Sequence, residues 1–271
     1  MANQRNRILL RKSYKRRPGP NQKKGYEVYL VTARHVIEAH RKSGKTEVQV
    51  RINPKDPKTP IQQFKIPDRP NPGEATWFFH PDNDIDIAIV RVNFEALYPL
   101  GYEPSFFLGD TNALTKARLI DRQVSAGDGT FVLGFPMNLA GSQKNHVIVR
   151  QGVIARISEM LEGASKTFMI DALVFPGNSG GPVVLRPEIV AIDGTKSQPS
   201  ANLIGVVTSY KPYTDVAVSP QTGRPRIAFE ENSGLAEVLP IDYVDETIDA
   251  WRKSQGLAKG QLAPAAPIEK R

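Results

Sequence analysis

One segment of the chain holds a serine in a setting suited to nucleophilic chemistry. Residues 175–182 read Phe-Pro-Gly-Asn-Ser-Gly-Gly-Pro, so glycines lie within two residues of Ser179 on both sides. Glycine adopts backbone conformations that a β-carbon blocks, and these let a turn expose a hydroxyl and aim peptide N–H groups at one point. Nucleophilic serine chemistry needs an exposed oxygen beside donors for the developing oxyanion. The segment therefore predicts Ser179 as a nucleophile, with an ordinary glycine-rich turn as the alternative.

A serine nucleophile needs a base, and the chain has four histidines. His35 stands where a predicted strand at residues 26–32 gives way to a turn, a place where a rigid support holds a side chain. His40 lies in a polar stretch, and His146 begins a strand without an evident partner. His80 lies beside acidic residues and is the second candidate. The sequence favours His35 as the base.

An acid must orient the base, and Asp86 occupies the most suitable position. It leads into a buried strand predicted at residues 86–92, where an unpaired carboxylate would be costly. A hydrogen bond to an imidazole would satisfy this carboxylate and fix the tautomer of the ring. Asp82 and Asp84 compete with it, although loop capping explains them too. With His80 they offer oxygen ligands of the kind that Ca²⁺ prefers, but we expect a solvated loop and predict no metal site.

The elements around these residues have the pattern of an all-β protein. Short strands bounded by Gly, Pro, Asn or Ser are predicted at 26–32, 46–52, near Phe64, and at 86–92, 130–134, 146–156, 167–173, 182–186 and 202–210. Their spacing is typical of a sandwich or barrel and not of βαβ units. A helical turn is predicted at 36–41. The helical spacing of Val244, Ile248 and Trp251 predicts a C-terminal helix at 241–255.

Three segments of the chain resemble the sequence motifs of trypsin-like serine peptidases. They are Thr-Ala-Arg-His-Val at 32–36, Asp-Ile-Ala-Ile-Val at 86–90 and Gly-Asn-Ser-Gly-Gly-Pro at 177–182. Their order of His, Asp and Ser is that of the chymotrypsin template. Two further segments resemble landmarks of the short bacterial branch related to the heat-shock proteases of the cell envelope: Val-Leu-Gly-Phe-Pro at 132–136 and Gln-Gly-Val-Ile at 151–154. The resemblance covers about residues 26–235.

The resemblance implies a chymotrypsin-like fold of two antiparallel β-barrels with the active site in the cleft between them. It implies a serine endopeptidase that hydrolyses peptide bonds through an acyl-enzyme. In this reaction His35 would take the proton of Ser179, and Asp86 would hold the imidazole. The backbone N–H groups of Gly177 and Ser179 would form the oxyanion hole, and no cofactor is needed.

The same resemblance implies where a protein or peptide substrate binds. Leu173 lies six residues before the serine, at the position that forms the base of the family's primary specificity pocket. An apolar residue there predicts a small or medium apolar side chain before the scissile bond. The strand at 206–210, and above all Thr208, Ser209 and Tyr210, would line the pocket and pair with extended substrate, as edge strands do. A plain core strand is the alternative for Val206 and Val207.

The predicted organisation has five parts: a basic disordered arm at 1–25, a first barrel at 26–120, a second barrel at 121–240, the helix at 241–255 and a disordered tail at 256–271. The arm has nine Lys or Arg residues and no acid, against a net charge of +8 for the chain. It could make a weak contact with nucleic acid, which we do not expect the folded part to bind. The family's glycine-rich first strand is missing from the arm, which leaves open whether the first barrel is complete at its N-terminal strand.

Composition excludes several further classes of protein. The chain has no cysteine, which excludes disulfides and thiolate catalysis. It has no apolar run of the ~18 residues that would span a membrane. Without a signal peptide, the sequence as written predicts a cytoplasmic protein, exported only if the start is misassigned. The principal alternative function is a protease-fold binding module with weak or no turnover, and the next is a nucleic-acid-associated protein that acts through the arm.

Overall fold

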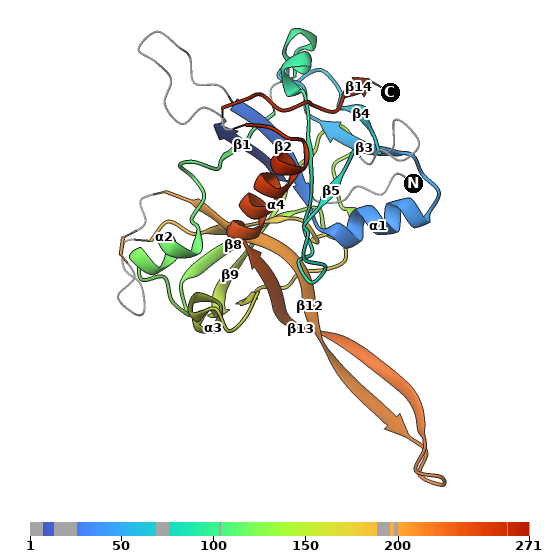
Figure 1. The fold of residues 1–271 in the computed structure, drawn as a ribbon. Coiled ribbons are helices and arrows are strands. Elements are labelled where there is room, and N and C mark those ends of the chain that lie inside the picture. The colour runs from blue at the N-terminus through green and yellow to red at the C-terminus, as the bar shows by residue number, and fades with distance from the viewer. Residues whose placement is uncertain are drawn as a thin grey trace.

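Strands dominate the described part of the chain, which confirms the predicted all-β class (Figure 1). The computed structural model describes residues 8–13, 26–68, 76–102, 104–188, 196–197, 200–258 and 260–270. The helices are short apart from the last: α1 (Arg34–Lys42), η1 (Phe94–Leu100), α2 (Lys116–Asp121), η2 (Pro136–Asn138), α3 (Ser158–Glu162) and α4 (Ile241–Ser254). None of the described helices is long and apolar enough to cross a membrane.

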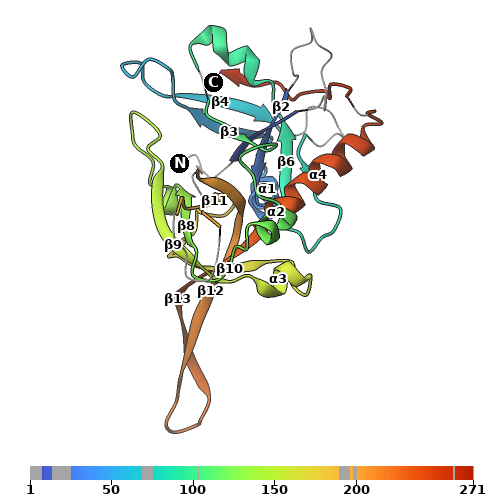
Figure 2. The same cartoon turned by 90° about the vertical axis from the view of Figure 1, so that its left-hand side faces the viewer.

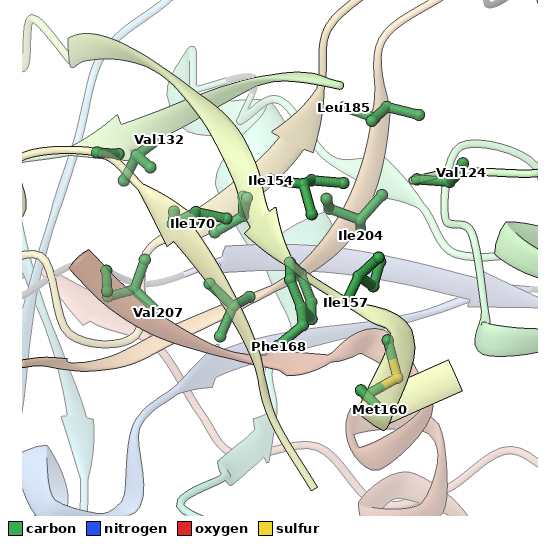
Figure 3. Close-up of a cluster of buried hydrophobic side chains, with 14 of the residues drawn as sticks. Val124, Val132, Ile154, Ile157, Met160, Phe168, Ile170, Leu185, Ile204 and Val207 are labelled. Atoms are coloured by element: carbon green, nitrogen blue, oxygen red, sulfur yellow. The ribbon is translucent and has the colours of Figure 1, made fainter. Parts of the chain in front are cut away.

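The second half of the chain forms a closed barrel of six antiparallel strands. In the order of the barrel they are β10 (Phe168–Asp171), β13 (Pro225–Pro240), β12 (Asn202–Val218), β11 (Pro182–Leu185), β8 (Gly129–Gly134) and β9 (Ile148–Arg156). Successive side chains of a strand point to opposite faces, so alternate residues fill the barrel. Figure 3 shows this core, in which Val132, Ile154, Phe168, Ile170 and Ile204 are buried.

The first half consists of two sheets that share a core. One sheet has the order β5 (Phe78–Phe79), β6 (Ala88–Arg91), β2 (Tyr26–Thr32), β1 (Ile8–Ser13) and β7 (Phe107–Leu108), and the other β14 (Glu269–Lys270), β4 (Gln62–Pro67) and β3 (Glu47–Ile52). Ile37, Val48, Phe64, Trp77 and Val90 are buried between them. In the described residues no ladder of hydrogen bonds joins the two sheets, so this half is not a closed barrel. Within the first sheet, β1 pairs parallel with β7.

The strand β1 corrects the expectation of an unstructured N-terminal arm. Residues 8–13 pair antiparallel with residues 26–31 of β2, and Leu10 is fully buried. The first sheet therefore has an N-terminal strand, although its sequence lacks the glycine-rich pattern of the family. The short apolar run Ile8-Leu9-Leu10 is ordered because it pairs with the edge of β2, although basic residues flank it. The rest of the predicted arm lies outside the described residues.

The C-terminal helix is confirmed, and the predicted disordered tail after it is wrong. Val244 and Ile248 of α4 pack against the first sheet. Beyond the helix, Ala263 is buried, Ala266 bridges to Val92, and β14 pairs with β4. The Ala- and Pro-rich composition of the tail concealed this, because the tail folds on the first half and not on a core of its own.

A buried carboxylate ties the first sheet to α4 and the tail. Glu27 of β2 is only 2% exposed. It accepts hydrogen bonds from Tyr29 Oη at 2.6 Å, Arg252 Nη1 at 2.7 Å and Ala263 N at 2.7 Å. Burial, reinforced by the hydrogen bond and charge of Glu27, raises the pKa of Tyr29 above its ordinary value. The cluster joins residues that are distant in sequence and therefore contributes to holding the two ends of the chain together.

Replacing Glu27 by alanine is expected to lower the free energy of unfolding by about 3–5 kcal/mol, because Arg252 would remain largely buried without its partner. Urea denaturation followed by fluorescence measures this change. A matched control is Glu159→Ala, which removes an exposed ion pair with Arg156 and should cost at most about 1 kcal/mol. The double variant Glu27→Ala/Arg252→Met should recover part of the loss. Equal losses in Glu27→Ala and the control would contradict the argument.

Candidate active site

The pairing of β2 with β6 brings His35 and Asp86 together. Thr32 at the end of β2 lies opposite Ala88 at the start of β6, so the first turn of α1 meets the residues that precede β6. Asp86 Oδ1 accepts a hydrogen bond from the backbone N–H of His35 at 2.8 Å. Asp86 Oδ2 lies 2.7 Å from Nδ1 of the His35 ring. The two oxygens of one carboxylate thus hold both the backbone and the ring of the histidine.

The second half of the chain adds a third contact to this carboxylate. Thr208 of β12 donates a hydrogen bond from Oγ1 to Asp86 Oδ2 at 2.8 Å. Asp86 is therefore shielded, with 22% of its side chain exposed, whereas the side chain of His35 is 49% exposed. A carboxylate with three donors is fixed in position, and the outer part of the imidazole faces the solvent.

The side chain of the neighbouring Arg34 does not bind the carboxylate of Asp86. Its Nε donates to Glu38 Oε1 at 2.7 Å, and its Nη1 donates to Asn83 Oδ1 at 2.8 Å. The guanidinium also lies over the ring of Phe79, 5.0 Å from its centroid. These contacts hold the arginine among residues of the first half, so its charge is engaged beside the histidine and not in the cleft.

Ser179 lies in a tight turn between β10 and β11. Asn178 is buried, and its Oδ1 accepts a hydrogen bond from the N–H of Phe175 at 3.0 Å, which closes the turn. The N–H of Gly180 donates to the carbonyl of Val207 at 2.8 Å and ties the turn to β12. Ser179 is half-buried. The sequence motif thus folds into a turn that is held from inside and from the neighbouring strand.

Gly177 occupies a conformation and a space that only glycine suits. Its φ is +101°, and a β-carbon at this position would lie 2.9 Å from the backbone oxygen of Phe135. A side chain would therefore strain the turn and push it away from the loop after β8. Among the described residues, neither the N–H of Gly177 nor that of Ser179 donates to a protein acceptor. Both donors are available to a ligand.

The hydroxyl of Ser179 has one acceptor in the described structure, the carbonyl oxygen of Thr208 at 3.4 Å. This is a long and weak hydrogen bond. The structure gives no direct bond between this hydroxyl and the His35 ring, but both residues line the same cleft. Serine and base are often loosely arranged before substrate binds, and a weakly held hydroxyl can turn about its Cα–Cβ bond.

The cleft has a volume of about 490 Å³, within the range of ligand pockets. It brings together most of the residues that the sequence predicts for the site: His35, Asp86, Ser179, Thr208, Ser209 and Tyr210. Two predicted residues, Leu173 and Gly177, do not line the cleft, and Leu173 is 49% exposed. Val207 also lines the cleft, as expected for the strand at 206–210, and the lining residues that the sequence did not assign are Val174, Phe175, Pro176 and Asn178. Most of these belong to the serine motif itself, which was the available signal.

The other acids near the site are engaged elsewhere. Lys166 Nζ binds Asp82 Oδ2 at 2.7 Å and Asp84 Oδ2 at 3.0 Å. The hydrogen bonds from Lys166 and from the N–H of Asp84 lower the pKa of Asp82. His80 is buried and accepts the N–H of Asp82 at its Nδ1. In the described residues no three His, Asp or Glu side chains gather as metal ligands.

A family model for the trypsin-like peptidase domain matches residues 20–192. The chain belongs to the trypsin-like peptidases. The matched region contains His35, Asp86 and the turn with Ser179. The predicted family and the peptidase class that it carries are therefore confirmed.

Two of the solved structures that the chain matches are of Rv3671c. One is a serine-to-alanine mutant of Rv3671c from M. tuberculosis H37Rv in its inactive form, with 13% identity, coverage of 86% of this chain and 84% of that chain, and a TM-score of 0.40. The other is the Rv3671c protease in its inactive form, with 13% identity, coverage of 92% and 90%, and a TM-score of 0.39. No curated protein matches this trypsin-like peptidase.

Proposed function

We propose that this trypsin-like peptidase is a serine endopeptidase with Ser179 as nucleophile, His35 as base and Asp86 as the group that orients the base. The observation that carries the proposal is that both carboxylate oxygens of Asp86 contact His35, one at its backbone N–H and one at its ring Nδ1. Ser179 lines the same cleft. The family match supports the peptidase class, and the roles of the three side chains are our inference from their contacts.

In the proposed reaction, Ser179 Oγ attacks the carbonyl carbon of the scissile bond while its proton passes to Nε2 of His35. Asp86 accepts from Nδ1, which keeps Nε2 free to act as the base, and stabilises the imidazolium. The imidazolium then gives its proton to the leaving amine, and an ester on Ser179 remains. A water molecule, deprotonated by His35, hydrolyses the ester and restores the hydroxyl.

The oxyanion of the tetrahedral intermediate would be bound by the N–H groups of Gly177 and Ser179. Neither donates to a protein acceptor within the described residues. The positive φ of Gly177 sets the direction of its peptide groups, and the buried Asn178 holds the turn between the two donors. Donors that are fixed before the reaction stabilise developing charge without a cost of reorganisation.

The lining of the cleft supports a preference for a small or medium apolar side chain before the scissile bond. Val174 and Val207 are buried at its wall, and Phe175 and Tyr210 complete the apolar part. Among the lining residues that the structure describes, Asp86 is the only acid, and it is already bound to His35 and Thr208. A basic substrate side chain would have no counter-charge there, and an unpaired buried charge is costly. We therefore infer that Val174, and not its neighbour Leu173, contacts the substrate side chain.

Labelling with a fluorophosphonate probe tests the proposal, because such probes react with an activated serine and not with any exposed hydroxyl. The wild type should be labelled and Ser179→Ala should not. Ser209→Ala is the matched control: Ser209 lines the same cleft, but its hydroxyl donates to Glu237 at 2.7 Å, so this variant should be labelled like the wild type. A folded wild type that takes no label would instead support a binding module without turnover.

A further inference from the structure

The hairpin of β12 and β13 continues far beyond the barrel. Figures 1 and 2 show it projecting from the body of the molecule as a two-stranded ribbon. We call residues 211–233 the arm from here on; this hairpin is distinct from the basic N-terminal segment at 1–25. Its strands pair from Pro212 with Asn232 to Val218 with Pro225. Five large apolar side chains of the arm are 44 to 59% exposed: Tyr213, Val216, Val218, Ile227 and Phe229.

A two-stranded ribbon with exposed apolar side chains is expected to gain stability when a further strand pairs with it. Two strands alone are marginally stable in water, and three or more are needed for independent stability. A long strand edge with exposed apolar side chains also offers unpaired N–H and C=O groups to any other strand. The arm therefore has the properties of a strand-pairing surface, and its two edges differ in what they can pair with.

The β12 edge of the arm is poorly suited to pairing with itself. The central residue of the segment from Tyr213 to Ala217 is Asp215. In an antiparallel pair centred there, two like charges would face each other, which is unfavourable.

The β13 edge, in contrast, is complementary to itself. Residues 226–230 read Arg-Ile-Ala-Phe-Glu, and Pro225 lies just before them, outside the segment. If two copies pair antiparallel about a two-fold axis at Ala228, Arg226 faces Glu230 of the second copy, and Ile227 faces Phe229 of the second copy. The symmetry repeats each contact, so one register gives two opposite-charge pairs and two apolar pairs. Such cross-strand pairs are the unit of stability in a sheet.

We propose that this peptidase dimerises by antiparallel pairing of the β13 edges of two arms, centred on Ala228. The register within the arm supports the result: Phe229 lies opposite Asp215 and Ile227 opposite Ala217, so both apolar side chains project from one face of the ribbon. Pairing therefore joins the apolar residues of both copies into one cluster on a four-stranded sheet. The contact is isologous and closes as a dimer. Arg226 and Glu230 line no part of the active-site cleft.

Sedimentation velocity over a range of concentrations tests the proposal on the full chain. The wild type should sediment as a dimer. Arg226→Glu and Glu230→Arg should each raise the dimer dissociation constant at least about tenfold, because each places like charges opposite one another twice. An equimolar mixture of these two variants should dimerise again, as should the double variant Arg226→Glu/Glu230→Arg. The control Arg224→Glu changes a charge outside the pairing and should leave the dimer intact.

The dimer is independent of the catalytic proposal, so each can fail alone. Circular dichroism and probe labelling verify that every variant is folded as the wild type is. A wild type that remains monomeric at all concentrations overturns the inference. So does a dimer that survives both single charge reversals, since its contact would then lie elsewhere than the β13 edge.

Discussion

Replacing Asp86 by asparagine is expected to lower kcat for peptide hydrolysis about 10⁴-fold, with KM within a few-fold of the wild type. The present contacts explain the size of the effect. Asp86 accepts from the N–H of His35 through Oδ1, and Oδ2 binds both the imidazole and the hydroxyl of Thr208. An amide at this site keeps the shape but presents a donor on one side, so the ring can adopt the tautomer that cannot accept the serine proton.

Steady-state kinetics with a chromogenic peptide measures this effect, with urea denaturation to show that the variant is folded. The matched control is Asp82→Asn, whose carboxylate binds Lys166 outside the cleft, and it should retain nearly full kcat. A loss of less than tenfold in Asp86→Asn would show that this carboxylate does not orient the base, and the role would then have to be sought elsewhere.

Replacing Gly177 by alanine is expected to lower kcat about 10²–10³-fold, the usual cost of losing one oxyanion donor. The added β-carbon would lie 2.9 Å from the Phe135 oxygen and would occupy a φ of +101°. The turn must shift to relieve both, which moves the N–H of Gly177 away from the position of the oxyanion. Binding of the substrate side chain is little affected, so the loss should appear in kcat more than in KM.

The control for this variant separates backbone strain from the loss of the donor. Gly223 also has a positive φ, +65°, but a β-carbon there would meet nothing within 4 Å. Gly223→Ala should therefore leave kcat unchanged while it carries a similar conformational cost. Wild-type kcat in a correctly folded Gly177→Ala would contradict the proposed oxyanion hole.

The local parts of the site could be predicted from sequence because each is a short segment with its own physical logic. Glycines around Ser179 predict a turn that exposes the serine hydroxyl. An acid at the start of an apolar strand predicts a carboxylate with a hydrogen-bond partner. The contact of Thr208 with Asp86 could not be predicted, since it joins residues 122 positions apart and depends on how the two halves dock. Leu173, which the resemblance assigns to the base of the specificity pocket, does not line the cleft, whereas its neighbour Val174 does.

The fold shows the same division between local and non-local information. The strand predicted at 202–210 is correct, but β12 continues to Val218 because β13 pairs with it past the lysine and proline at 211 and 212. Neither the segment of β1 nor the tail has enough apolar residues to fold alone, so composition predicts both as unstructured. Both become ordered by adding to surfaces that other parts of the chain create, and composition does not reveal such surfaces.

The attachment of the C-terminal segment to the first half has a consequence for synthesis of the protein. Glu27 pairs with Arg252, which follows it by 225 residues, and Lys65 of β4 lies opposite Glu269 of β14, which follows it by 269 − 65 = 204 residues. At a translation rate of about 5–20 residues per second, on the order of 10 to 45 s separate the emergence of the two partners. During that interval the nascent chain holds Glu27 without its guanidinium and β4 without one neighbour. The half that bears His35 and Asp86 therefore matures last, although the ribosome makes it first.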